Sequence, residues 1–133
     1  MVQLYQFKSR YKMKYILLAL LITISSAFAE VKNQYISQEL LNSKVKIIDI
    51  RTPSEWAETG IVKGSIPITF FNEQGSYNID EFLKELNKNV KTNEEFALIC
   101  RTGSRTKLVS NFLSTKLGYN VINLQGGILY ALG

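Results

Sequence analysis

The sequence contains no histidine, and its 133 residues include a single cysteine, Cys100. The absence of histidine excludes a hydrolase or protease in which a histidine base activates the cysteine. With one thiol, the chain cannot form an internal disulfide. Proline is scarce as well, and we find neither an internal repeat nor a low-complexity tract. A composition that is 46% hydrophobic and 20% charged is typical of one globular domain.

Acidic residues are absent before Glu30, whereas four basic residues precede it: Lys8, Arg10, Lys12 and Lys14. Residues 30–133 hold 12 basic and 11 acidic residues, so the net charge of +5 belongs mostly to the first 29 residues. A nucleic-acid-binding domain needs a basic face of its own. The charge pattern therefore argues against nucleic acid as a partner.

The first 29 residues resemble a secretory leader, with a basic start, an apolar run over residues 16–24, and small residues at Ala27 and Ala29. This order predicts a signal peptide, residues 1–29, cut after Ala29, and hence an exported, periplasmic protein without stable membrane association. A retained membrane anchor is the alternative, but residues 16–29 are shorter than the roughly 20 residues that a spanning helix needs. Met13 also fits the start of such a leader. Residues 1–12 are then an upstream extension of the reading frame, and both start sites stay open.

Alternating strand and helix patterns fill residues 30–133 and predict an α/β domain. Nearly unbroken apolar runs predict buried strands, and a period of 3.6 residues predicts helices. In residues 104–117 the expected apolar side holds Leu108, Phe112, Leu113 and Leu117. Such alternation predicts an open parallel sheet flanked by helices on both faces. The expected strands are 45–50, 65–68, 96–100 and 121–124, and the expected helices begin near Ser37, near Pro53, and span 79–87 and 104–117.

Cys100 stands at the carboxyl end of a predicted strand, where open α/β sheets bind their ligands. The next residues lead directly into a helix, so backbone N–H groups and the helix dipole are expected to favour the thiolate. Gly103 permits a tight backbone path, and Arg101 and Arg105 can hold an anion beside the sulfur. A buried cysteine that only fills space is the alternative.

The run Cys-Arg-Thr-Gly-Ser-Arg at residues 100–105 resembles the active-site loop of rhodanese domains. Residues 49–56, 64–67 and 126–128 resemble, in order and spacing, three further motifs of that family. The resemblance spans roughly residues 34–130. It implies a rhodanese-like fold for the domain at 30–133, with a persulfide formed on Cys100.

By this resemblance, the loop residues after Cys100 bind the substrate: Arg101, Thr102, Gly103, Ser104 and Arg105. Asp49 and Arg51 are expected to serve as structural support through an ion pair. The resemblance implies transfer of a sulfane sulfur from thiosulfate, or a similar small anionic donor, to cyanide or a thiol. It implies no cofactor and no metal, and we expect a monomer.

Two other functions stay open. A rhodanese-like module that binds or senses a partner without turnover is one, although such modules frequently lose the cysteine. A phosphatase or arsenate reductase is the other. Enzymes of that kind place an arginine six positions after the cysteine, where this chain has Thr106, while Arg105 lies at five. The shorter loop favours sulfur over phosphate.

Overall fold

The computed structural model describes residues 29–133. The predicted signal peptide thus lies outside the described residues, apart from Ala29. No helix within residues 29–133 combines the length and the apolar character needed to cross a membrane.

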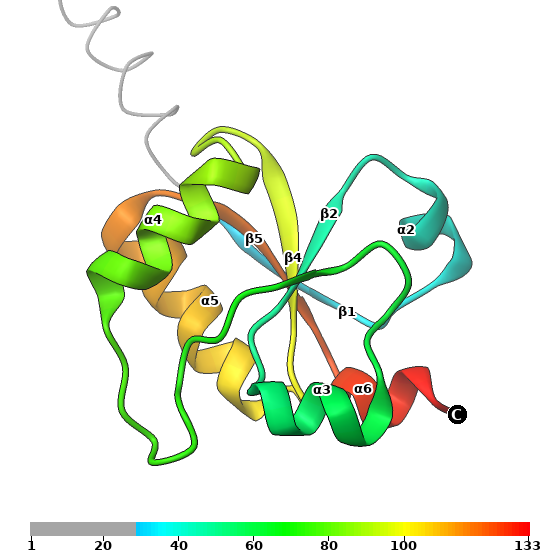
Figure 1. The fold of residues 1–133 in the computed structure, drawn as a ribbon. Helices are drawn as coiled ribbons and strands as arrows, with labels where there is room; N and C mark the ends of the chain where they lie inside the picture. Colours follow the sequence, from blue (N-terminus) through cyan, green and yellow to red (C-terminus); the bar gives the residue numbers. More distant parts are fainter. Residues whose placement is uncertain (1–28) are drawn as a thin grey trace, which may run out of the picture.

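A five-stranded sheet forms the centre of the molecule (Figure 1). Its strands are β1 (Val31–Gln34), β2 (Lys46–Asp49), β3 (Ile66–Pro67), β4 (Glu95–Ile99) and β5 (Asn120–Leu124). They lie in the order β1-β5-β4-β2-β3, and each pair of neighbours is parallel. The α/β class with an open parallel sheet is therefore confirmed.

Five helices connect or follow these strands. They are α2 (Gln38–Asn42), α3 (Pro53–Thr59), α4 (Ile79–Asn89), α5 (Ser104–Leu117) and α6 (Gly127–Ala131). In Figure 1, α4 and α5 lie together on one side of the sheet, and α2 lies on the other. Helices α3 and α6 both appear at the bottom of the view, at the end toward which β2 and β4 run.

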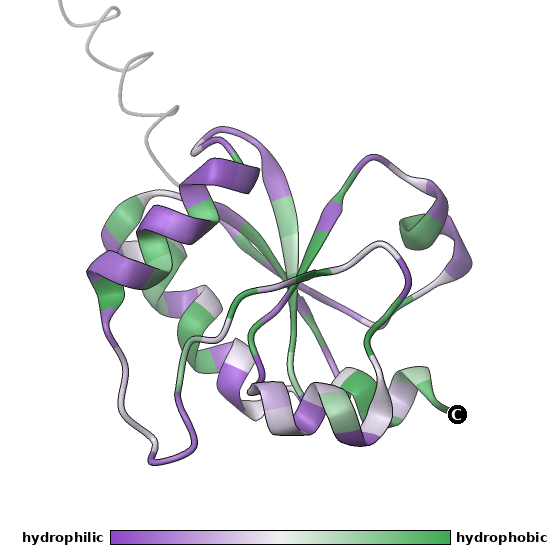
Figure 2. Ribbon diagram, viewed as in Figure 1, coloured by the Kyte–Doolittle hydropathy of each residue, from purple (hydrophilic) through white to green (hydrophobic). Residues whose placement is uncertain are grey.

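Two hydrophobic cores lie on the two faces of the sheet. Along β4 the side chains alternate, so that Phe96 and Leu98 join the core under α4 and α5, while Ala97 and Ile99 join the core under α2 and α6. Cys100 lies on the same face as Phe96 and Leu98 and joins the core under α4 and α5. The central strands are therefore apolar on both faces, as Figure 2 shows, while the outer helices carry hydrophilic residues.

The described structure corrects two expectations. Strand β1, which spans Val31–Gln34, is missing from the expected strands, because this edge strand buries little of its surface. Helix α5 turns only part of the expected side to the sheet. Leu113 is buried and Phe112 packs against the core as expected, but Leu108 is 63% exposed, and Val109, which lies outside the expected side, is buried. Small hydroxyl residues, Ser110 and Ser114, complete its buried side, so counting large apolar residues predicted that side only in part.

Candidate functional site

Cys100 follows β4 directly and opens a loop that closes at the first turn of α5. The loop turns at Gly103, whose φ of 97° lies in the left-handed region that favours glycine. This turn lets the Gly103 N–H donate to Cys100 Sγ at 3.2 Å. Helix α5 has no side-chain cap, so the N–H groups of its first turn stay available to an anion.

The glycine pair after β5 lies directly against this loop. The N–H of Ile128 donates to the Cys100 carbonyl at 2.9 Å, and the N–H of Leu129 donates to the Arg101 carbonyl at 3.1 Å. A Cβ on Gly127 would lie 2.4 Å from the Cys100 carbonyl oxygen, closer than any side chain tolerates. The start of α6 therefore fixes the loop backbone, and this contact requires glycine at position 127.

The predicted loop side chains divide into two groups. Arg101, Thr102 and Ser104 are exposed, and the hydroxyls of the last two lie 3.2 Å apart. Arg105 instead turns toward α3, where its Nη1 and Nη2 donate to the two carboxylate oxygens of Glu55 at 2.9 and 2.6 Å. In this structure Arg101 is therefore the loop guanidinium that faces solvent.

Glu55 connects the loop to α3. Its carboxylate also accepts from the backbone N–H of Thr52 at 3.0 Å, which completes a capping box at the start of the helix. The Arg105 guanidinium is the main cause that lowers the pKa of Glu55 to about 2, with help from the Thr52 bonds and against the effect of burial. The same hydrogen bond raises the pKa of Arg105, so both groups are charged near neutral pH.

A second ion pair lies deeper, at the carboxyl end of β2. Arg51 and Asp49 are 1% and 0% exposed, and Arg51 Nη2 donates to Asp49 Oδ2 at 2.8 Å. Arg51 also donates to the Thr59 hydroxyl at 2.8 Å and to the Gly60 carbonyl at 2.9 Å, where α3 ends. The pair therefore joins the sheet to α3, which in turn carries Glu55.

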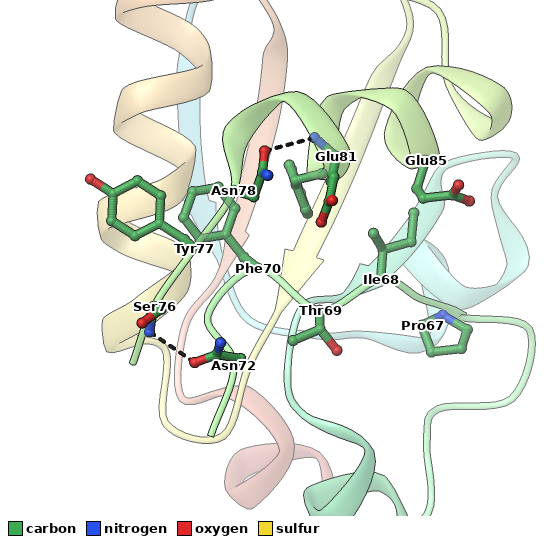
Figure 3. A pocket seen from close by; sticks show the side chains of 11 residues that line it. Pro67, Ile68, Thr69, Phe70, Asn72, Ser76, Tyr77, Asn78, Glu81 and Glu85 are labelled. Atoms are coloured by element: carbon green, nitrogen blue, oxygen red, sulfur yellow. Dashed lines mark hydrogen bonds between the residues drawn. The ribbon is translucent and has the colours of Figure 1, made fainter. Parts of the chain in front are cut away.

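Access to the thiol is narrow, because Cys100 is only 1% exposed. A cavity of about 600 Å³ lies elsewhere, between α4 and the segment after β3, and Figure 3 shows Phe70, Tyr77 and Glu81 in its lining. Its lining does not include Cys100.

Residues 29–133 contain no cluster of three or more histidine, cysteine, aspartate or glutamate side chains suited to a metal ion. The loop after Cys100 and the carboxyl end of β2 carry charged groups of another kind, namely the two ion pairs and the exposed guanidinium of Arg101. This set can attract and orient a small anion beside a sulfur nucleophile.

Sequence reasoning missed the partner of Arg105. Glu55 lies 50 residues away, and only its place in the Thr-x-x-Glu capping box indicated that its carboxylate is held at a helix start. It also missed Thr106, the buried residue whose hydroxyl lies beside Cys100 Sγ, and Asn123, to which that hydroxyl donates. The signal for these was a polar residue, Asn123, within the apolar run of β5.

The family comparison and the solved structures agree on one family. The model of the rhodanese-like domain matches residues 32–130. The uncharacterized protein RP600 of Rickettsia prowazekii is 32% identical over 92 residues, which cover 66% of this chain and 72% of the relative.

Solved structures give the same picture. A rhodanese-like domain protein of Staphylococcus aureus is 27% identical, with a TM-score of 0.57 over 74% of this chain and 89% of the other. A rhodanese-related protein of Thermoplasma volcanium is 30% identical, with a TM-score of 0.50 over 68% of this chain and 77% of the other.

Proposed function

Since the chain belongs to the rhodanese-like domain family, we propose that it is a sulfurtransferase that carries a sulfane sulfur as a persulfide on Cys100. One observation carries the proposal: the only thiol of the chain lies at the carboxyl end of β4, accepts a hydrogen bond from the Gly103 N–H, and faces an uncapped helix start. These features stabilise a sulfur anion, which is the nucleophile that the reaction needs.

The proposed donor is thiosulfate or a similar small anion. In the first half-reaction the Cys100 thiolate attacks the outer sulfur of thiosulfate. A sulfur–sulfur bond forms, the bond between the two thiosulfate sulfurs breaks, and sulfite leaves with its electron pair. Arg101 would attract the donor, and the loop N–H groups would hold the charge that develops on it.

In the second half-reaction cyanide or the thiolate of an acceptor attacks the outer sulfur of the persulfide. That sulfur leaves with the acceptor, and the Cys100 thiolate is restored. Neither step needs a general base, which is consistent with a chain that lacks histidine.

The test is the intact mass of the purified chain before and after thiosulfate, followed by cyanide. We expect a gain of one sulfur atom that cyanide then removes. Cys100→Ser is the matched control, because it changes one atom and removes the only thiol. A mass that never changes in the unsubstituted chain would contradict the proposal and favour a module that binds a partner without turnover.

A further inference from the structure

Asn123 is a buried amide in the interior of β5, only 3% exposed, between apolar neighbours. A buried amide is costly unless its hydrogen bonds are made. Asn123 Nδ2 donates to Asn33 Oδ1 of the neighbouring strand β1 at 2.9 Å, and Asn123 Oδ1 accepts from the Thr106 hydroxyl at 2.6 Å. In this structure the amide nitrogen therefore faces Asn33 and the amide oxygen faces Thr106.

Thr106 lies in the first turn of α5, is fully buried, and has three acceptors around its single hydroxyl hydrogen. The Asn123 oxygen lies at 2.6 Å, the Gly103 carbonyl at 3.1 Å, and Cys100 Sγ at 3.6 Å. Because one hydroxyl donates one hydrogen, the bond to Asn123 leaves only lone pairs of Thr106 facing the sulfur. A lone pair beside sulfur favours the protonated thiol.

The sulfur thus lies between two opposed contacts. On one side the Gly103 N–H donates to it, which favours the thiolate. On the other side the Thr106 oxygen can only accept a hydrogen, as long as Asn123 holds the hydroxyl hydrogen.

We propose that Asn123 is a positioning residue that sets how readily Cys100 ionises, by drawing the Thr106 hydroxyl hydrogen away from the sulfur. When Asn123 Oδ1 is removed, the hydroxyl is free to donate to the thiolate, which is a stronger acceptor than the neutral Gly103 carbonyl. The proposal rests on the proposed function in taking Cys100 as the reacting group. Its test uses alkylation and needs no sulfur transfer.

The side chain of Asn123 makes its hydrogen bonds to the uncharged Asn33 and Thr106, and to none of the charged groups around the thiol. Arg105 pairs with Glu55, Arg51 pairs with Asp49, and Arg101 is exposed beside the loop. A shift caused by Asn123 is therefore measured against a constant electrostatic background.

The experiment follows the rate of iodoacetamide alkylation of Cys100 in the full chain, as a function of pH. For Asn123→Leu we expect the profile to move to lower pH and the rate near neutral pH to rise about three- to tenfold. A merely loosened structure would raise the rate at every pH without moving the midpoint. An unchanged profile overturns the proposal.

Thr106 supplies the decisive control. In a Thr106→Val background, which has no hydroxyl, Asn123→Leu is expected to leave the profile where Thr106→Val alone has it, whereas in a Thr106→Ser background the shift returns. A shift that persists without the hydroxyl overturns the mechanism.

Asn33→Ala provides a second route if Asn123→Leu fails to fold, because Asn33 is exposed and its side-chain oxygen accepts from the buried amide nitrogen. A shift in the same direction, but smaller, is expected, and no shift counts against the proposal. If the alkylation profiles move as stated while thiosulfate forms no persulfide, the positioning role stands and the proposed function fails. If a persulfide forms while the profiles do not move, the proposed function stands and the positioning role fails.

Discussion

Two arginine–carboxylate pairs lie at the same end of the sheet, and they differ in what surrounds them. Arg51 and Asp49 are 1% and 0% exposed, whereas Arg105 and Glu55 are 28% and 19% exposed. Arg51 makes further hydrogen bonds to the end of α3, while within residues 29–133 the guanidinium of Arg105 donates to Glu55 alone.

The difference in exposure indicates that the Arg51–Asp49 pair is a permanent structural contact, whereas the Arg105–Glu55 pair can separate. Breaking a fully buried pair leaves a charge without a partner and without water, which is costly. Water can replace either member of a partly exposed pair at small cost. Arg105 is therefore the arginine that can leave its carboxylate to bind an anion, and Arg51 is not.

The largest expected effect comes from neutralising one carboxylate of each pair. Asp49→Asn is expected to lower the free energy of unfolding by about 3 kcal/mol, because it leaves Arg51 buried and without its counter-charge. Glu55→Gln, the same chemical change in the partly exposed Arg105–Glu55 pair, is expected to lower the free energy of unfolding by about 1 kcal/mol or less. Urea unfolding followed by the fluorescence of Trp56, the only tryptophan, measures both. Equal losses would mean that the two pairs do not differ in kind.

The next effect is on substrate binding. Arg105→Gln is expected to raise the KM for thiosulfate about tenfold, because an anion loses one of its charged partners. Glu55→Gln is expected to lower KM, since it releases Arg105 toward the loop. Lys107→Gln is the matched control, as it removes an exposed positive charge two residues further along α5. If Arg105→Gln and Glu55→Gln both raise KM alike, the Arg105–Glu55 pair has a structural role and Arg105 does not bind the anion.

The same contrast shows what the sequence could predict. Strands β2 and β4 were found from their apolar runs, and α5 was located at its observed bounds, because these patterns are local and repeat over several residues. The loop after Cys100 was singled out because six consecutive residues carry its motif. The Asp49–Arg51 pair also joins residues two positions apart, within reach of a local motif.

Contacts between distant residues escaped prediction. Glu55 and Arg105 are 50 residues apart, and Asn123 lies 90 residues from Asn33. The buried side of α5 was only partly predicted, because beside Leu113 it holds Thr106, Ser110 and Ser114. Small hydroxyl residues do not stand out in a hydrophobic pattern, although here one of them contacts the sulfur.

The smallest expected effect is a dependence of stability on pH that the Arg105–Glu55 pair causes. Arg105 lowers the pKa of Glu55 from 4.5 to about 2, so the ionised form is favoured in the folded state. Glu55 therefore stabilises the fold fully above the unfolded value of 4.5, and this contribution is lost as the pH falls toward about 2. Since the pair is partly exposed, we expect the contribution to be about 1 kcal/mol after solvent screening.

Other carboxyl groups also titrate in this range, so the measurement is the difference between the unsubstituted chain and Glu55→Gln. Urea midpoints at about pH 5 and about pH 3 are expected to show that difference shrinking by roughly half, because Glu55 in the unfolded chain is mostly protonated at the lower pH. Glutamine does not titrate, so the variant provides the baseline for all other groups. A difference that stays constant between the two pH values would mean that Arg105 does not hold Glu55 ionised in solution. The Arg105–Glu55 ion pair would then not connect α3 to the loop after Cys100.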